Sequence, residues 1–594
     1  MSREPASPSF PPARRAVLGG TLALAAAALT PGVAAASPRR PDRGARPSTA
    51  TYATDATYAN DATTSGGDPH VLFDEPSGYY YAYCTGGSDD GYYFGVHRSP
   101  DLSTWERLPG GALRADDPKQ WGKDWFWAPE VYRNPDTGLY YLFYAARMGS
   151  TLAEQYFRYP DFEEPCSIGV AVSRTPEGPF RNIDDRPLDY HPYKPDYHDV
   201  NLIMDADQLT PPATEEEGRT APLGSYIPMI DPNLLFDEGR IYLYFSSNAY
   251  RNWVWDTGLG KYVEESNIAA VELTTHWWRD PEGATMPTIH PRYVDANART
   301  GSGTGGADGR RRDGFVPVLT YAADPQSWED AHVNDHATSG GSKKDRRWEE
   351  GSTAWRHDYV HAGERRTLYY LTYSANNFEN QYYGVGYAVA EHPLGPWRKY
   401  PNNPVLSQNP DVGMYSTGHG SPASSPDGSE LYYVHHGRTS PTSPDRVVYT
   451  ERLRIDDHHA DAGAAGRPLL TIDQSTGDEP VPAGTAPFTL TVGPAAVRVG
   501  GAVDVACAVR SAAGAAFDLS APENRVRAEL RPAGPASVRV EDGTVTLRGL
   551  RRGTARLTLV YQRRRADGSY RDVHQARHGG RPEAVKVTVP VVVR

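Results

Sequence analysis

The chain has 594 residues, a formal charge of −13 and a mean hydropathy of −0.61, and 39% of its residues are hydrophobic. This length leaves room for more than one domain, and the polar, aromatic-rich composition, with 38 Tyr and 12 Trp, excludes a membrane protein and a disordered one. The negative charge argues against nucleic acid as the main partner, whereas a neutral sugar is compatible with it.

The first 36 residues are predicted to be an export signal. Arg14-Arg15 precedes an alanine- and leucine-rich run that ends near Leu29, and Ala34-Ala35-Ala36 forms a small-residue cleavage pattern. The apolar run is shorter than the ~20 residues that span a bilayer, so no membrane span is expected. The paired arginines indicate the twin-arginine type, with an ordinary secretory signal as the alternative; both predict a secreted, extracellular protein. Residues 37–60 are predicted to be a flexible leader.

Five tyrosine-rich segments with alternating side chains recur within residues 61–475. Alternation with period two predicts β-strands, and one unit repeated at long intervals is typical of a propeller or a solenoid. Four segments are followed by a strand of small residues, and after the fifth the strand Arg446-Val447-Val448-Tyr449 takes that place. The sequence therefore predicts an all-β fold, a five-bladed β-propeller over residues 61–475. The tyrosine-rich segments begin at Tyr79, Tyr140, Ile241, Tyr369 and Leu431.

Acidic residues stand at the start of three of these repeats. Asp68 opens the first, Asp231 the third and Glu350 the fourth. Because the innermost strands of a propeller line one channel, we expect these three carboxyl groups to face one pocket. An Asp-Pro pair is by itself a common turn, and only the position at a repeat start separates Asp68 and Asp231 from other such pairs. Glu349 competes with Glu350, since neighbours on a strand face opposite ways and only one enters the channel.

Two long insertions interrupt the repeats. The acidic stretch 184–226 is predicted to be a solvated loop, and the glycine-rich stretch 281–345 a mobile or partly ordered flap at one mouth of the channel.

Cys84, Cys166 and Cys507 cannot all pair within the chain. Cys84 and Cys166 fall in neighbouring repeats, where we expect two buried thiols, with a disulfide as the alternative.

The sequence changes character after about Gln474. Residues 476–486 are predicted to be a linker, and residues 487–594 contain short alternating strands that predict a small antiparallel β-sandwich. Residues 540–550, followed by Gly553, resemble bacterial immunoglobulin-like modules. Arginine outnumbers acid here, which is compatible with contact to an acidic polysaccharide or a cell surface; a solvated arginine-rich face is the alternative.

Residues 64–475 resemble glycoside hydrolase family 43, the five-bladed propellers that cleave arabinose-, xylose- and sometimes galactose-containing plant polysaccharides with inversion of configuration. The resemblance rests on an ordered set of motifs, each of them weak alone. They are Asp68-Pro69 in the first repeat, Trp127-Ala128-Pro129-Glu130-Val131 in the second, Ile230-Asp231-Pro232 in the third, Glu350-Gly351 in the fourth and Gly418-His419-Gly420-Ser421 in the fifth.

This resemblance implies a role for each of the three acids. Asp68 is implied as the general base, Glu350 as the general acid, and Asp231 as the carboxylate that raises the pKa of the acid and helps to orient it. An inverting hydrolase needs an ionised carboxylate to activate water and a protonated one to serve the leaving oxygen, ~6.5–9.5 Å apart. The family's acid precedes Gly, which favours Glu350 over Glu349.

The resemblance also implies substrate contacts. Trp127 is expected to present its ring to a sugar face, with packing between blades as the alternative, and Trp121, Trp125 and Phe126 are candidates to extend that platform. Arg446 matches the family arginine that holds substrate hydroxyls and the carboxylate array, with an exposed surface arginine as the alternative.

His419 is similar to the histidine that, in many members, lies near a calcium ion on the propeller axis. Calcium prefers oxygen ligands, mostly waters in such a site, and a lone histidine is more often a hydrogen-bonded core residue. No cofactor is required for the chemistry, so this ion would be structural.

The sequence thus predicts a secreted inverting hydrolase of α-L-arabinofuranosyl or β-xylosyl linkages in plant cell-wall polysaccharides or oligosaccharides. One alternative is a galactan- or fructan-directed glycosidase of a related propeller family, although the motifs of the fructan hydrolases are not found. The other is a non-catalytic carbohydrate-binding propeller, against which the presence of all three acids argues.

Overall fold

The computed structural model describes residues 57–58 and, with gaps, residues 64–594. The predicted export signal 1–36, most of the leader and most of the linker lie outside the described residues. The gaps after residue 64 are 100–101, 103–104, 158–163, 189–209, 220–227, 293–314, 427, 458–466, 475–478, 481, 483–487, 511–515, 521–523, 565–569 and 576–582. In the described part of the chain, no helix is both long and apolar enough to cross a membrane.

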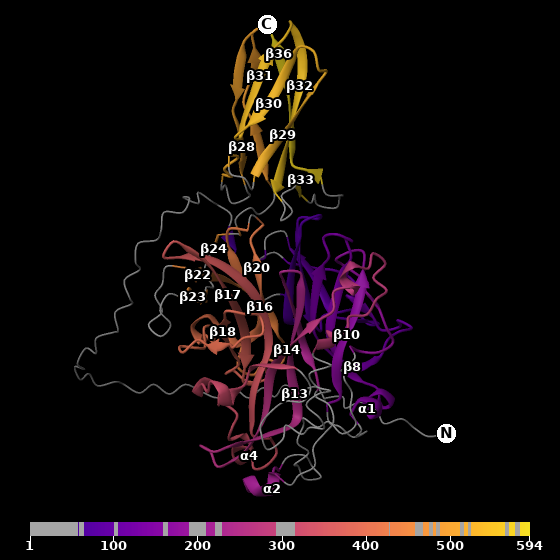
Figure 1. The fold of residues 1–594 in the computed structure, drawn as a ribbon, viewed down its shortest axis with the longest axis vertical. Coiled ribbons are helices and arrows are strands. Elements are labelled where there is room, and N and C mark those ends of the chain that lie inside the picture. Colours follow the sequence, from indigo (N-terminus) through magenta and orange to yellow (C-terminus); the bar gives the residue numbers. More distant parts are fainter. Residues whose placement is uncertain are drawn as a thin grey trace, which may run out of the picture. The chain divides into compact units, whose positions relative to one another are not determined.

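Five antiparallel units of strands follow one another between residues 67 and 473, which confirms the predicted all-β class for this part (Figure 1). The first strands are β2 (Gly67–Asp74), β8 (Gly122–Arg133), β12 (Ile230–Asp237), β16 (Arg346–His361) and β20 (Tyr415–Ser424). The predicted tyrosine-rich segments are the second strands, β3 (Tyr79–Thr85), β9 (Tyr140–Met148), β13 (Arg240–Asp256), β17 (Glu364–Ala375) and β21 (Leu431–Arg438). The third strands are β5 (Gly95–Ser99), β10 (Cys166–Ser173), β14 (Lys261–Leu273), β18 (Gly384–Ala390) and β22 (Val447–Asp456). The outermost strands are β6 (Glu106–Arg107), β11 (Arg181–Asn182), β15 (Val316–Leu319), β19 (Arg398–Lys399) and β23 (Leu469–Asp473).

The first strands form a closed ring. Each packs against the first strand of the next unit, and β20 packs against β2. Side chains in the ring accept backbone N–H groups from the following unit, which satisfies donors that the strand irregularities leave unpaired. These bonds run from Val131 N to His70 Nδ1 (3.2 Å), from Ala354 N to Asn233 Oδ1 (2.9 Å) and from Val71 N to Ser421 Oγ (3.0 Å).

Tyrosine suits the second strands because its ring fills a buried space while its hydroxyl reaches a neighbouring unit. Tyr83 donates its hydroxyl proton to the carbonyl oxygen of Pro176 at 2.6 Å, and Tyr370 donates to that of Pro468 at 2.8 Å. Both tyrosines are fully buried. Phenylalanine would fill the same volume but leave these carbonyl groups without that donor.

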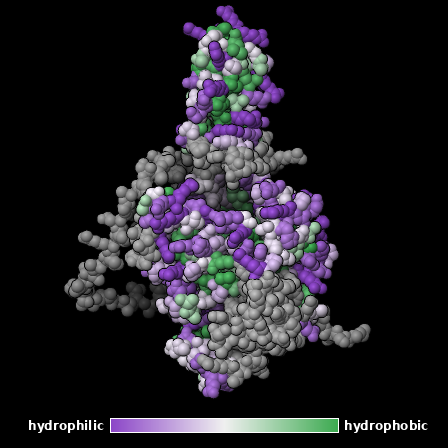
Figure 2. Space-filling view, in the orientation of Figure 1, coloured by the Kyte–Doolittle hydropathy of each residue, from purple (hydrophilic) through white to green (hydrophobic). Residues whose placement is uncertain are grey.

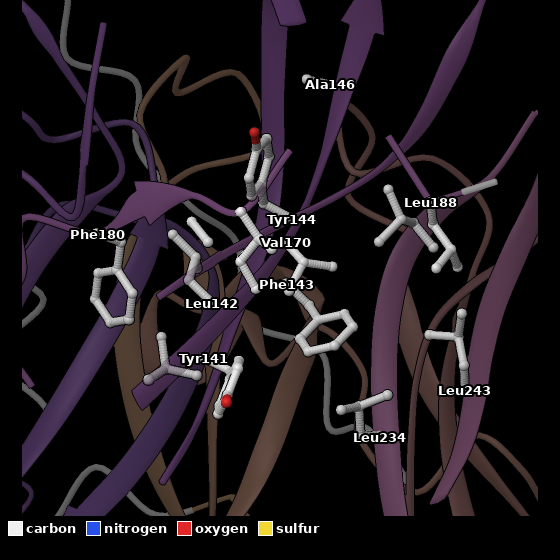
Figure 3. Packing of buried hydrophobic residues seen from close by; sticks show 14 of the residues in the cluster. Tyr141, Leu142, Phe143, Tyr144, Ala146, Val170, Phe180, Leu188, Leu234 and Leu243 are labelled. Atoms are coloured by element: carbon white, nitrogen blue, oxygen red, sulfur yellow. The ribbon is translucent and has the colours of Figure 1, made fainter. Parts of the chain in front are cut away.

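The largest core cluster has its centre at β9. Its side chains alternate between two buried faces: Leu142 lies on the side of Phe180, and Phe143 lies toward Leu234 and Leu243 (Figure 3). A strand buried on both faces explains the near-continuous apolar run from residue 139 to residue 146.

The segment 281–345 differs in part from the predicted flap. Residues 315–345 are packed, with β15, the short helices η2 (Tyr321–Ala323), η3 (Ser327–Glu329) and α4 (Asp335–Thr338), and a fully buried Glu329. Lys399 holds Glu329 through two contacts of 2.8 and 2.9 Å. The two partners of this ion pair are far apart in the sequence, so no local pattern predicts it. The start of β16 also pairs in parallel with β14, which joins the third and fourth units in one sheet.

Short elements complete the description of this part. They are β4 (Tyr92–Tyr93), β7 (Leu113–Arg114), α1 (Ser150–Phe157), α2 (Glu215–Arg219), η1 (Trp277–Arg279) and η4 (Pro410–Val412). The leader and the linker contribute β1 (Thr57–Tyr58) and β24 (Glu479–Pro480), which pair with each other. Hydrophilic residues cover most of the described surface that Figure 2 shows, with hydrophobic residues in smaller groups. Cys84, Cys166 and Cys507 are free thiols, and the first two are buried, as expected.

Residues 488–594 form short strands in separate small sheets with a common core. The larger sheet has the order β26 (Ala495–Val497), β36 (Lys586–Val593), β32 (Gly553–Arg564) and β29 (Asn524–Arg531), with β33 (Tyr570–Asp572) beside β32. A second sheet has the order β27 (Ala502–Val505), β31 (Thr544–Gly549) and β30 (Ala536–Glu541). Two further pairs are β25 (Thr489–Val492) with β28 (Cys507–Arg510) and β34 (His574–Gln575) with β35 (Glu583–Ala584).

Candidate active site

Each first strand of the ring has the same irregularity where the acids stand. The strand register shifts there, and one residue adopts a positive φ in the left-handed region. For residues other than glycine this backbone costs about 1 kcal/mol or more, so its recurrence marks equivalent positions of the five units. These positions are Asp68 (φ 50°), Ala128 (47°), Asp231 (53°), Gly351 (60°) and His419 (39°).

Glu350 stands one residue before this position. Its equivalents in the other units are Gly67, Trp127, Ile230 and Gly418. The acids therefore come from two different positions of the repeat, which explains why they occur in unlike sequence contexts.

Asp68 is a buried carboxylate held by cationic and imidazole groups. Arg446 donates from Nη1 to its Oδ1 at 2.7 Å, and Nδ1 of His419 lies 3.4 Å from the same oxygen. His436 Nδ1 accepts the backbone N–H of Asp68 at 3.1 Å. Burial alone would raise the pKa of Asp68, but Arg446 and His419 hold that pKa well below its usual value. Asp68 is therefore ionised at neutral pH.

Asp231 links two neighbouring units. Its Oδ2 accepts a hydrogen bond from Ser246 Oγ at 2.9 Å and another from the backbone N–H of Gly351 at 3.0 Å. Burial and the nearby Asp68 raise the pKa of Asp231, while His419 lowers it. The bond to Gly351 fixes the backbone immediately after Glu350, so Asp231 orients that residue as well as adding negative charge beside it.

The pKa of Glu350 is shifted in the opposite direction to that of Asp68. Tyr383 donates its hydroxyl proton to Glu350 Oε1 at 2.8 Å. Burial, together with the negative charges of Asp231 and Asp68, raises the pKa of Glu350 to about 8. Glu350 is therefore protonated at neutral pH, and the residue as a whole is half-buried. The structure thus brings the three predicted acids together.

Glu349 points away from this group. Its side chain is fully buried and contacts Lys399 Nζ at 2.6 Å. Neighbours on a strand face opposite sides, and here only Glu350 interacts with Asp68 and Asp231. This resolves the competition between the two glutamates in favour of Glu350.

Two glycines make room for the polar groups around the acids. A Cβ atom on Gly67 would lie 2.0 Å from Arg446 Cζ, and one on Gly418 would lie 2.3 Å from the ring of Tyr383. Both distances are far shorter than a van der Waals contact, so neither side chain could reach its carboxyl group past an alanine. Arg446 also lies over the ring of Phe378, with its Cζ 4.7 Å from the ring centroid.

Trp127 is half-buried in a small apolar group with Cys166 and Ile230, the residue directly before Asp231. Its ring stacks on Trp125, with centroids 5.3 Å apart and an interplanar angle of 10°. Arg147 lies over Trp125 at 3.9 Å.

Trp121 and Phe126 do not extend this platform, contrary to prediction. Both are buried: Trp121 stacks on Tyr144, and Phe126 stacks on Tyr93. Trp121 lies immediately before β8 and Phe126 within it, and both side chains belong to the large core cluster.

His419 combines a positive φ with a position between two units. Its backbone N–H donates to Ser374 Oγ at 2.7 Å, and its ring would contact any Cβ placed on Gly351. In the described part of the chain, no three His, Cys, Asp or Glu side chains are grouped to hold a metal ion. His419 and Asp68 supply few direct ligands, so a calcium ion here would be held mostly by water, and it stays a prediction.

Sequence reasoning missed Tyr383, His436 and Phe378. Tyr383 and Phe378 lie in the connection between β17 and β18, which has no counterpart among the repeat motifs. His436 lies in β21, where alternation indicates only a buried side chain. The one available signal was the small residue at Gly418, whose missing side chain makes room for the ring of Tyr383.

The sequence model described as "Glycosyl hydrolases family 43" matches residues 62–210 and 326–460, just under half of the chain. These two segments are similar to the glycosyl hydrolases of family 43. The two matched segments contain Asp68 and Glu350, whereas Asp231 falls between them.

One curated protein is similar to a short part of the chain. "Beta-D-galactofuranosidase xynD" of Aspergillus niger (strain ATCC MYA-4892 / CBS 513.88 / FGSC A1513) is 35% identical over 96 residues, which are 16% of this chain and 27% of that protein. The chain therefore matches only about a quarter of the length of this curated relative.

Two solved structures are similar over more of the chain. A thermostable family-43 glycoside hydrolase is 28% identical over 72% of this chain and 99% of its own, with a TM-score of 0.47. An endo-1,4-beta-xylanase from Bacteroides thetaiotaomicron VPI-5482 is 26% identical over 71% and 99% of the two chains, with a TM-score of 0.43.

Proposed function

We propose that the chain is an exported, inverting glycoside hydrolase that cleaves α-L-arabinofuranosyl or β-xylosyl linkages of plant cell-wall polysaccharides or oligosaccharides. One observation carries this proposal: two carboxyl groups in one group of contacts have opposite pKa shifts, Asp68 well below and Glu350 above the ordinary value. Two carboxyl groups whose environments push their pKa values apart suit a general base and a general acid.

In the proposed reaction, ionised Asp68 takes a proton from water while that water attacks the anomeric carbon. Glu350 gives its proton to the glycosidic oxygen as the carbon–oxygen bond breaks, so the products are an inverted sugar and an alcohol. Arg446 stays bound to Asp68 and keeps it ionised until the water proton arrives. After turnover, the two carboxyl groups exchange their protons with solvent.

Tyr383 has a specific part in this scheme. Because its hydroxyl donates to Oε1 of Glu350, it favours the acid proton on the other oxygen, Oε2. Asp231 supports the same orientation through the N–H of Gly351. Both residues position the acid, whereas Glu350 delivers the proton.

The proposal includes the domain architecture. The closed ring of five first strands supports a five-bladed β-propeller over residues 61–475, with the acids at its centre. The small sheets and common core of residues 487–594 support an immunoglobulin-like β-sandwich. The paired arginines before an apolar run support export by a twin-arginine signal in residues 1–36, with residues 37–60 as leader and 476–486 as linker.

A β-D-galactofuranoside deserves a place among the substrates to be tested. The Aspergillus relative is described as a β-D-galactofuranosidase. The rings of α-L-arabinofuranose and β-D-galactofuranose share one configuration and differ only in the length of the exocyclic carbon chain. A pocket built for the first sugar therefore needs only extra room to accept the second.

The decisive experiment compares aryl α-L-arabinofuranoside, β-D-xyloside and β-D-galactofuranoside with arabinan and arabinoxylan, and follows the first product by NMR. We expect turnover of at least one pentoside and an inverted anomer. A retained anomer would overturn the inverting scheme and favour a fructan-type hydrolase. Binding without turnover on every substrate would favour the non-catalytic alternative.

A further inference from the structure

Residues 487–594 contain 18 Arg and Lys and nine Asp and Glu, while the whole chain contains 61 and 74. The C-terminal part is therefore positively charged within an acidic protein. Nothing in the proposed hydrolysis uses this charge. Its distribution over the strands shows whether it is spread evenly or concentrated.

Five of these cations lie on one face of one sheet. Along β29, Val526 and Leu530 point into the core, whereas Arg525, Arg527 and Arg531 are exposed on the other face. In β32 and β36 the same alternation leaves Arg556 and Lys586 exposed beside them. We call the outward side of β29, β32 and β36 the basic face.

Strand register orders the basic face into rows. Arg531 stands directly opposite Arg556, and both are exposed. Four residues away along β29, Arg527 stands opposite the buried Val560, which in turn pairs with Lys586. Arg527 also contacts Asp572 at 3.0 Å, so an anionic ligand would compete with this carboxylate. Like charges placed opposite each other destabilise a sheet, so this arrangement has a cost that a bound anion would remove.

A row of hydroxyl groups separates the two basic rows. Thr558 and Thr588 are cross-strand partners between them, with their Oγ1 atoms 3.0 Å apart. Glu529 completes this row on β29 and pairs with Arg531. A ligand that lies along the strands thus meets cations, then the two hydroxyls beside the Glu529 carboxylate, and then cations again.

The second sheet has no such face. Its exposed Arg539 and Arg548 alternate with Asp504, Glu541 and Thr546, and Arg539 pairs with Glu541 at 2.7 Å. The two sheets therefore differ: cations stand opposite each other on the basic face, whereas on the second sheet they alternate with acids.

We propose that the basic face binds an acidic polysaccharide, a chain of uronic acids whose carboxylates meet the two arginine rows and whose hydroxyls meet the threonine row. Guanidinium groups bind carboxylates through paired hydrogen bonds, and exposed charges of this kind confer salt-dependent affinity. Cations on either side of a hydroxyl row favour an acidic polymer rich in hydroxyl groups over DNA, whose backbone carries none. Plant cell-wall polysaccharides include such uronic-acid chains, so this contact would hold the enzyme beside material of the kind it is proposed to cut.

The test measures binding of the full chain to soluble polygalacturonate by affinity electrophoresis and calorimetry, over a series of salt concentrations. The test variant is Arg531→Gln/Arg556→Gln, and the matched control is Arg539→Gln/Arg548→Gln. Both variants remove two exposed arginines from the C-terminal sheets, and in each pair one arginine has a glutamate two residues away on its strand. Debranched arabinan, double-stranded DNA and phosphatidylglycerol vesicles are the comparison ligands.

We expect the test variant to weaken polygalacturonate binding about tenfold and the control to change it less than twofold. Rising salt should weaken wild-type binding, and neutral arabinan should not bind this face. An equal loss of polygalacturonate affinity in both variants would mean that only the net charge matters, and it would overturn the proposal. Equally tight binding of DNA or vesicles, or no binding of polygalacturonate, would overturn it as well. Activity on a small aryl glycoside should stay unchanged in both variants, so this outcome is independent of the proposed hydrolysis.

Discussion

Tyr383 donates its hydroxyl proton to Oε1 of Glu350 at 2.8 Å, and its ring stacks on His436, with centroids 5.7 Å apart. His436 in turn accepts the backbone N–H of Asp68. One tyrosine from the connection between β17 and β18 thus contacts the proposed acid and a neighbour of the proposed base. A substitution that removes only its hydroxyl separates the hydrogen bond from the packing.

We expect Tyr383→Phe to lower kcat/KM about tenfold and to move the alkaline limb of its pH profile to higher pH. The hydroxyl stabilises the ionised form of Glu350, so its removal raises the pKa of that acid. The control is Tyr373→Phe, which removes a similar bond, to Glu329 Oε1 at 2.7 Å, outside the three acids. An alkaline limb that moves equally in both variants would assign the effect to packing alone.

Substitution of the two proposed catalytic acids should separate chemistry from stability. Asp68→Asn and Glu350→Gln should each lower kcat by about 10²–10⁴, because proton transfer is lost. An aryl glycoside with a good leaving group should partly spare Glu350→Gln, since its oxygen needs less protonation. The control Glu349→Gln should leave kcat within a few-fold and lower the unfolding midpoint instead, because it breaks a buried contact with Lys399. Near-normal kcat in either acid variant on a poor leaving group would contradict the assignment.

Glu350 should make the protein less stable as the pH rises from about 4.5 to about 8. Its pKa is raised to about 8 in the folded protein, so the folded state holds a proton that the unfolded state has already lost in this range. The stabilising effect of the protonated carboxyl is complete below the unfolded pKa and disappears as the pH passes through the folded pKa. Glu350→Gln should therefore raise the free energy of unfolding at pH 8 by about 1–2 kcal/mol and change it little at pH 4. Thermal unfolding at both pH values provides the measurement, and an equal shift at both would contradict the raised pKa.

Sequence patterns predicted the parts of the site that the repeat itself carries. The tyrosine-rich segments located the second strands, and the place of Asp68, Asp231 and Glu350 at repeat starts located the acids. Local alternation is enough to locate these strands and acids, because the faces and the starts of a strand determine which residue types stand next to each other in the sequence. The same local logic left Glu349 and Glu350 open, and only the buried Lys399 on β19 shows which one faces away.

The groups that tune the acids could not be predicted in this way. Tyr383 comes from a connection outside the repeat, and Lys399 reaches Glu329 from 70 residues away. The left-handed backbone at Asp68 and Asp231 could not be predicted either, because an aspartate in the sequence does not by itself indicate a positive φ. Such features follow from contacts between distant segments, which one sequence alone does not display.

Gly67 offers a test of whether Arg446 controls the ionisation of Asp68. In Gly67→Ala the new methyl group would occupy the place of the guanidinium, which must then leave Asp68. Loss of that cation raises the pKa of Asp68, so the acidic limb of the kcat/KM profile should move to higher pH and kcat/KM at neutral pH should fall about tenfold. Gly149→Ala is the matched control, because nothing lies within 4 Å of a Cβ atom there. An unchanged acidic limb in Gly67→Ala, with both variants folded by thermal unfolding, would show that His419 and the backbone hold Asp68 ionised without the arginine.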